Sequence, residues 1–217
     1  MPTIHDVLLT SIRWLLGLTA GTISALLLSL LEFLLLRQRA SAYFSRLLVL
    51  AAHFLRALPV IALVPLVQYL GVNERWKVAL IAWAVTFPIW IAVRQVLATE
   101  MIDTELTLVG AQIKERDILL HYQLPKAITG IFRGVEISIG IGWISVVAAE
   151  WVGTYTEGFW AGGLGYRIEM AHNYNNWAGM FACLGLFGLL GIATTIAWRN
   201  LIRLPLGMFE FRAAATS

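Results

Sequence analysis

Long apolar runs separated by short polar segments dominate the chain. Five of these runs are long enough to cross a hydrocarbon core of about 30 Å, which takes about 20 helical residues. No alternation of apolar and polar residues with the period of a strand persists, so we expect an all-α integral membrane protein and not a barrel. The predicted spans, within a single transmembrane domain of residues 1–217, are residues 14–36, 47–70, 78–97, 127–149 and 177–198.

The segment 100–125 interrupts this pattern with a cluster of charges, all of them before residue 118. Each charge at the centre of a membrane helix costs about 2.5–3.5 kcal/mol, so this segment is not expected to span. Its apolar residues recur at helical spacing until Leu124 and Pro125, where the pattern stops. We therefore expect an amphipathic helical hairpin outside the membrane, with one apolar face that serves as a docking surface. The alternative is a helix lying on the lipid surface, which the nearly balanced flanking charges disfavour.

Composition and charge agree with a membrane protein. Hydrophobic residues make up 59% and charged residues 13% of the chain, against about 45–50% and 25% in soluble domains. The net charge of +3 is dispersed, so we expect membrane lipid as the surroundings and no nucleic acid as a partner. Lys and Arg concentrate on the side of the 100–125 segment, which predicts that this side faces the cytoplasm. With five spans, the N-terminus would lie outside and the C-terminus in the cytoplasm.

No motif for catalysis or metal binding is present in the sequence. The chain has no Gly-Lys pair and hence no phosphate-binding loop, so we expect it not to hydrolyse ATP. The four histidines are scattered without the spacing of a metal site. We therefore expect a chain that is not an enzyme, with no catalytic residue, no metal and no cofactor of its own.

Polar and proline residues within the second predicted span point to a solute pathway. Arg56 lies inside this span, and Pro59 and Pro65 interrupt it. A charge at that depth should face a cavity or a partner, and the carbonyl groups that proline frees are tolerated only against protein or water. We interpret residues 55–66 as lining a pore, with a merely kinked structural helix as the alternative. Arg56 would suit an anionic solute or form an ion pair.

Rows of small residues predict close contacts between helices, within one chain or across a dimer. The rows are Gly130/Gly134, Ser138/Gly142 and Gly185/Gly188/Gly191. For the row that begins at Gly185 we favour packing within the chain.

Several segments resemble the binding-protein-dependent ABC transporter permeases. In chain order, the similar motifs are LRALPVIALVPLVQYLGV, FPIWIAV, VGA, LPKA and GIFRGVEISIGIGWISVVAAE. The resemblance covers about residues 13–203 and is strongest to the branch that imports nitrate, sulfonates, taurine and bicarbonate. The Glu-Ala-Ala triplet of the family falls on Thr104-Glu105-Leu106 here, so its first small residue is a leucine. Importers of uncharged vitamin precursors share these motifs, and a channel or secondary transporter without an ATPase is a further alternative.

The resemblance implies a multi-pass protein of the cytoplasmic (inner) membrane that works with other chains. The expected partners are ABC ATPase subunits, which would hold ATP and Mg, a second permease chain in a homodimer, and a periplasmic or lipid-anchored solute-binding protein. The family usually has six spans, so the first one is expected to be missing here or a five-span form to exist. The residues expected in the element that couples to the ATPase are Glu105, Gly110, Ala111, Leu124 and Pro125.

Two carboxylates complete the candidate sites. Glu136 lies one turn after Arg133, and the two would form an ion pair on one helix face. Glu150 matches the last residue of the family's VAAE word, so it is expected either to anchor the outer gate or to contact solute. Either carboxylate is also a candidate partner for Arg56. The segment after Glu150, to Asn176, is rich in Gly, Trp and Tyr, which fits an aromatic belt or a contact surface for the solute-binding protein.

Overall fold

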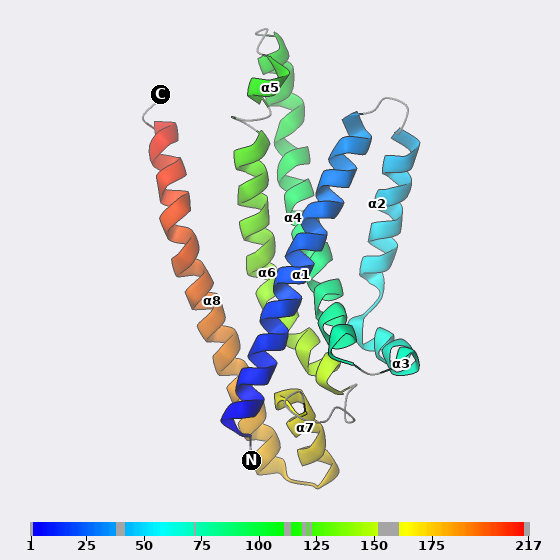
Figure 1. Cartoon of the computed structure of the whole chain (residues 1–217). Coiled ribbons are helices and arrows are strands. Elements are labelled where there is room, and N and C mark those ends of the chain that lie inside the picture. Colours follow the sequence, from blue (N-terminus) through cyan, green and yellow to red (C-terminus); the bar gives the residue numbers. More distant parts are fainter. Residues whose placement is uncertain are drawn as a thin grey trace.

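The computed structural model describes residues 2–37, 42–71, 73–110, 114–118, 121, 123–151 and 161–214. In this part of the chain the regular elements are all helices, which confirms the predicted all-α fold (Figure 1). The helices are α1 (Ile4–Arg37), α2 (Ala42–Ala57), α3 (Val60–Leu70), α4 (Glu74–Gly110), α5 (Glu115–Ile118), α6 (Leu124–Trp151), α7 (Leu164–Asn173) and α8 (Trp177–Ala214).

Four of these helices are long and apolar enough to cross a membrane, and α2 and α3 add a fifth crossing if the bent pair counts as one. Large apolar side chains on α1 and α8 remain exposed, as Leu27 and Leu189 illustrate, and lipid solvates such surfaces without penalty. The four apolar segments are Ile4–Leu35, Glu74–Leu97, Leu124–Trp151 and Trp177–Leu201.

Side-chain caps fix where several helices begin. Thr3 precedes α1, and its hydroxyl accepts from the amide of Asp6 at 3.2 Å. The Asp6 carboxylate in turn accepts from the amide of Thr3 at 2.9 Å, which completes a capping box. Asn73 accepts from the amide of Trp76 before α4, and Asn176 accepts from the amide of Gly179 before α8. Because of the first cap, α1 starts ten residues before the predicted first span.

The centre of the bundle consists of α1, α4 and α6. A Cβ at Gly134 of α6 would lie 2.6 Å from the Cα of Ile89 of α4, and one at Gly130 would lie 2.8 Å from the Cα of Val93. Only glycine allows two helix backbones to approach this closely. Trp14 of α1 and Trp143 of α6 stack with ring centroids 4.9 Å apart. The Gly130/Gly134 row therefore packs within the chain.

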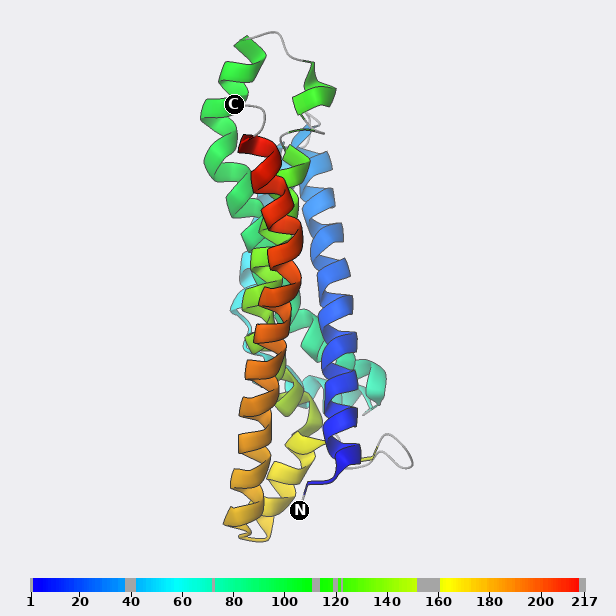
Figure 2. The ribbon, with the colours of Figure 1, turned by 90° about the vertical axis from the view of Figure 1, so that its left-hand side faces the viewer.

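The other row of glycines behaves differently. A Cβ at Gly185 or Gly188 of α8 would meet no described atom within 4 Å, whereas one at Gly191 would lie 3.9 Å from the Trp143 ring of α6. Of this row, only Gly191 therefore lies at a contact within the described chain. Instead α8 contacts α6 through aromatic side chains, with Phe187 edge-on to Trp143 at 6.0 Å and Trp198 6.0 Å from Phe132. Figures 1 and 2 show α8 running along the outside of the bundle.

The second predicted span, residues 47–70, is not one straight helix. Its two halves, α2 and α3, meet at an angle of 88°. Pro59 stands before the first residue of α3 with φ −66° and ψ 137°, and it lacks the N–H that a continuous helix needs. Pro65 lies inside α3 without ending it. Of the two prolines, only Pro59 breaks the span.

The bundle has two distinct ends, which we call the α5 end and the α7 end after the short helix found at each. The N-terminal end of α1 lies at the α7 end, and α8 finishes at the α5 end (Figures 1 and 2). Helix α4 runs without interruption for 37 residues between the two ends. Consequently one helix joins the expected coupling segment to the opposite end of the molecule.

The close approach of α6 to α4 yields a stability prediction. Gly134→Val would force Ile89 and the α4 backbone away, and overpacking of this kind costs about 1–3 kcal/mol. Gly140→Val on the same helix is the matched control, because a Cβ there meets nothing within 4 Å. We expect Gly134→Val to lower the unfolding temperature of the detergent-purified protein clearly and Gly140→Val to leave it almost unchanged. Equal shifts for the two variants would contradict the packing described.

Candidate functional site

The expected coupling residues fall on the α4–α5–α6 connection. Glu105 and Gly110 belong to the last turns of α4, while Ala111 lies outside the described residues. The pair Leu124 and Pro125 begins α6 and does not end a loop helix as expected. Proline is well tolerated in a first helical turn, where no intrahelical partner for its missing N–H exists. Within residues 100–125, α4 continues as far as Gly110, the short helix α5 follows, and α6 begins only at Leu124, below α5 (Figure 2).

The expected pathway residues of the second span lie at the α2–α3 bend. Arg56 is in the last turn of α2 with an exposed side chain, and Pro59 and Pro65 are exposed as well. His53, one turn before Arg56, packs edge-on to Trp90 of α4 at 5.6 Å. The bend therefore presents a cation on a face of the bundle that no described helix covers.

Glu136 and Glu150 have other partners than Arg56. Glu136 accepts a hydrogen bond from Nε of Arg199 at 2.7 Å, which joins α6 to α8 in place of the expected pair with Arg133. Glu150 is buried and pairs with Arg13. Neither carboxylate is therefore at the bend.

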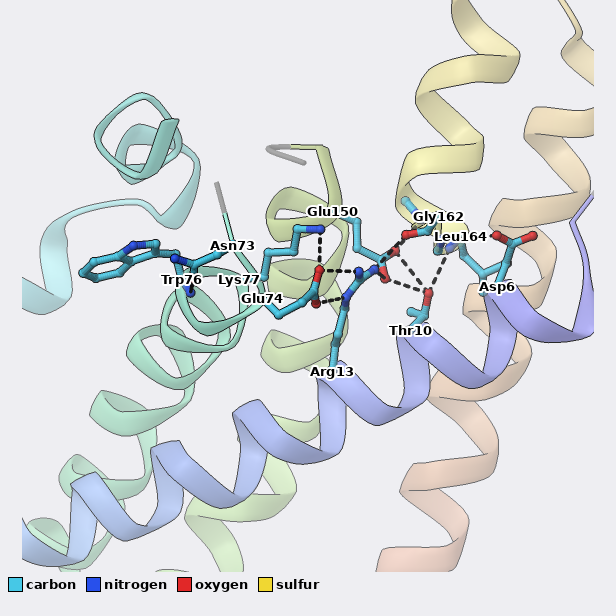
Figure 3. Close-up of polar contacts among 12 residues, drawn as sticks. Asp6, Thr10, Arg13, Asn73, Glu74, Trp76, Lys77, Glu150, Gly162 and Leu164 are labelled. Atoms are coloured by element: carbon cyan, nitrogen blue, oxygen red, sulfur yellow. Dashed lines mark hydrogen bonds and ion pairs between the residues drawn. The ribbon is translucent and has the colours of Figure 1, made fainter. Parts of the chain in front are cut away.

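A buried polar network at the α7 end is the most developed site in the described chain (Figure 3). The Arg13 side chain is fully buried and binds Glu74 through two parallel bonds, Nε to Oε2 at 2.7 Å and Nη2 to Oε1 at 2.8 Å. Its Nη1 donates to Oε1 of Glu150 at 2.9 Å and to the carbonyl of Gly162 at 2.8 Å. Lys77 donates to Glu74 at 2.8 Å. Arg13 thus connects α1, α4, α6 and the segment before α7.

Glu150 and Thr10 connect this network to the first turn of α7. The Thr10 hydroxyl donates to Glu150 at 2.8 Å and accepts from the amide of Leu164 at 2.8 Å. Glu150 also accepts from the amide of Gly165 at 2.7 Å. A Cβ at Gly165 would lie 2.9 Å from the Cβ of Glu150, so this glycine permits the contact. Of the two roles expected for Glu150, anchoring and contact with solute, this environment favours anchoring.

Asp6 and Arg167 extend the network along α7. Asp6 accepts from the amide of Gly163 at 3.1 Å and from Nε of Arg167 at 3.0 Å. Gly163 has φ +118°, a backbone conformation that a side chain would strain. The first amides of α7 are therefore bound by side chains from other helices.

A smaller polar group lies nearer the α5 end, between α1 and α4. Glu32 is buried and accepts from Trp90 Nε1 at 2.9 Å and from Arg94 Nε at 2.8 Å. The Arg94 guanidinium also lies over the Trp90 ring, 5.8 Å from its centroid. This polar group and the Arg13–Glu74 pair attach α1 to α4 at two levels of the bundle.

Sequence reasoning missed most members of the network. Asp6, Thr10 and Arg13 recur at i, i+4 and i+7, which places them on one face of a helix. That spacing was the available signal, and the assignment of these residues to a segment before the first span concealed it. Glu74 and Lys77 were equally assigned to a loop.

A further titratable group lies on α7, outside the network. Glu169 of α7 has a carboxylate oxygen without a hydrogen-bond partner in the described chain, and burial raises the pKa of this carboxyl. Within the described residues, no three His, Cys, Asp or Glu side chains are grouped so that they could hold a metal ion. The network is hence an arrangement for holding helices, with its charges mutually paired.

Comparison with known sequences identifies the protein family of this chain. Residues 17–203 match the family described as binding-protein-dependent transport system inner membrane component. This chain belongs to that family. The permease is also similar to a putative ABC transporter permease protein of Methanocaldococcus jannaschii, with 35% identity over 64% of this chain and 50% of the relative.

Two further relatives have names that mention a solute. A putative aliphatic sulfonates transport permease protein of Bacillus subtilis is 28% identical over 67% of this chain and 55% of the relative. A nitrate import permease protein of Synechococcus elongatus is 31% identical over 29% of this chain and 20% of the relative. The permease spans about half the length of the curated Methanocaldococcus jannaschii and Bacillus subtilis relatives.

The buried network predicts a large difference between two arginines. Arg13→Gln leaves two carboxylates without their buried cation, and breaking a buried ion pair costs about 3–5 kcal/mol. Arg199→Gln removes a cation from a largely exposed pair, where the cost is about 0–1 kcal/mol. Thermal unfolding of the purified permease should show a marked loss for the first variant only. If Arg13→Gln unfolds at the temperature of the unmodified protein, the network does not hold the helices together.

Proposed function

We propose that this permease is the membrane-spanning subunit of an ATP-driven importer that carries a small solute across the cytoplasmic membrane. The observation that carries the proposal is the length of α4 in a chain of this family. A helix of 37 residues is about 55 Å long, whereas the hydrocarbon core is about 30 Å thick. Because α4 starts in the buried network at the α7 end, its excess length extends beyond the bilayer at the α5 end. This extension is suited to contact a motor outside the membrane.

The motor is a pair of separate ATPase subunits, which hold ATP and Mg and dock at the α5 end on the cytoplasmic side. The coupling element comprises Glu105 and Gly110 at the end of α4, Ala111, and Leu124 and Pro125 at the start of α6. Leu124 is half exposed and offers an apolar contact. Displacement of this element acts on two long helices that pack closely against each other, so the force reaches the opposite end of the bundle.

The first test of this function is binding to the ATPase. Gly110→Arg places a long charged side chain in the coupling element and should abolish co-purification with the partner ATPase subunit. Asn173→Arg adds the same side chain at an exposed position of the α7 end and serves as the control, which should co-purify normally. Normal binding of the Gly110→Arg variant would contradict docking at this element.

The solute pathway is proposed to run past the α2–α3 bend, on the face where Arg56 is exposed. Five crossings enclose little space alone, so a second copy of the permease related by a two-fold axis completes the pathway. A periplasmic or lipid-anchored solute-binding protein delivers the solute at the α7 end. The exposed cation and the names of relatives that mention sulfonates and nitrate support a small anion such as nitrate, a sulfonate, taurine or bicarbonate.

Substitution of Arg56 tests both the pathway and the anion. In proteoliposomes with the complete transporter, Arg56→Gln should lower uptake of the transported anion at least about tenfold, since a hydrogen bond to a charged group is worth about 1.5–3 kcal/mol. Arg46→Gln removes an exposed cation from the same helix and should leave uptake unchanged. Uptake would be measured against a panel of the four anions and an uncharged vitamin precursor. Equal uptake by both variants would remove Arg56 from the pathway.

A further inference from the structure

Helix α7 begins in a way that ties its position to other helices. The free amides at a helix N-terminus normally bind water or a nearby side chain of the same segment. Here Gly163, Leu164 and Gly165 donate to Asp6, Thr10 and Glu150, at 3.1, 2.8 and 2.7 Å. The first two acceptors belong to α1 and the third to α6. The start of α7 therefore follows any displacement of those two helices.

The same acceptors are connected to α4 through Arg13. Glu150 and Glu74, at the α7 ends of α6 and α4, share this guanidinium; the side chains of Arg13 and Glu150 are fully buried, and that of Glu74 is 18% exposed. Separating the partners would leave a buried charge unpaired, which is strongly unfavourable. The α7 ends of α4 and α6 and the start of α7 therefore stay together when the helices move.

The apolar contacts of α7 involve α8 and Val7 of α1, and a short turn at residues 174–176 joins α7 to α8. Leu164 and Ile168 of α7 form a small cluster with Cys183 of α8, against which Met180 and Phe187 also pack. Helix α8 contacts α6 through aromatic rings, the Trp143–Thr194 hydrogen bond and the largely exposed Glu136–Arg199 pair. Without the close backbone approach seen between α4 and α6, it can shift more easily. Helix α7 is thus held to α1 and α6 by polar contacts, and it meets α8 through apolar side chains and the connecting turn.

We propose that Arg13, Glu150 and Thr10 form a latch that makes α7 a gate helix at the α7 end, carried as one body with α1, α4 and α6. The inference rests on the proposed function, because the motion originates at the coupling element. Arg13, Glu150 and Thr10 are positioning residues that act through α7 and do not contact solute. Displacement of the α5 end by the ATPase is transmitted along α4 and α6 to the latch, which moves α7 relative to α8.

The latch is tested first on the permease alone, in lipid nanodiscs, by the distance between spin labels at positions 75 and 172. Arg75→Cys and His172→Cys place labels on exposed positions of α4 and α7, and Cys183→Ser removes the only native cysteine. The unmodified latch should give one narrow distance distribution. Glu150→Gln should broaden or split this distribution. Glu169→Gln makes the same change on α7, at a carboxylate whose Oε2 has no hydrogen-bond partner in the described chain, and should leave the distribution narrow.

Thr10→Val is a milder latch variant for the case that Glu150→Gln does not fold. It removes the hydroxyl that binds both Glu150 and the amide of Leu164, and it keeps nearly the same shape. It should broaden the distribution as well. An unchanged, narrow distribution in Thr10→Val, or in a folded Glu150→Gln, would overturn the proposal.

The gate role is tested in the reconstituted transporter by the amount of solute moved per ATP hydrolysed. The latch variants should lower this ratio about tenfold, in the range of ordinary coupling energies, while ATP hydrolysis continues. A merely structural role would lower uptake and hydrolysis together and leave the ratio unchanged, which would overturn the proposal. If the unmodified permease shows no ATP-dependent uptake, the proposed function fails, while the spin-label distances still decide whether the latch exists.

Discussion

The guanidinium of Arg13 is charged at any physiological pH and lies inside an apolar bundle. The arrangement of the surrounding helices follows from how this charge is neutralised. One carboxylate comes from the start of α4 and the other from the end of α6, so the two helices must meet α1 at this level. The geometry with Glu74 is bidentate, the strongest form of such a contact. A carbonyl of the segment before α7 takes a remaining guanidinium proton. Four separate parts of the chain therefore converge on a single side chain.

Below this level, the central helices are held by close packing and not by charge. Gly130 and Gly134 bring the backbone of α6 onto that of α4, and the Trp14–Trp143 stack fills the space beside α1. The peripheral helices are attached through side chains only. The structure thus combines a stiff centre of three helices with α8 and the α2–α3 pair around it. A division of this kind suits a transporter, in which some helices transmit force and others must yield.

The all-α fold and most of the membrane helices could be predicted from apolar length alone, because a bilayer tolerates few alternatives to an apolar helix of about 20 residues. The break at Pro59 was also accessible, since proline lacks the amide that helix continuation needs. Pro65 was not distinguishable from it in sequence, although only one of the two ends a helix. What decides between them is the packing around each, which no local pattern contains.

Polar residues were the main source of error. Asp6, Arg13 and Glu74 precede the predicted spans 14–36 and 78–97, whereas the structure places them within α1 and α4, where charges from distant segments neutralise one another. The capping box of Thr3 and Asp6 was visible in the sequence and marks the true start of α1. Glu150 was found through its place in a family motif, but its partner Arg13, 137 positions away, could not be.

The network also has an electrical consequence. Its acidic members Asp6, Glu74 and Glu150 are matched by the basic members Arg13, Lys77 and Arg167. Moving one elementary charge through a potential of 100 mV involves about 2.3 kcal/mol, whereas an assembly with no net charge exchanges almost no energy with the field. Movement of this network as a unit would therefore cost nearly the same with or without a membrane potential, and the network itself would contribute almost nothing to any voltage dependence of the transport cycle.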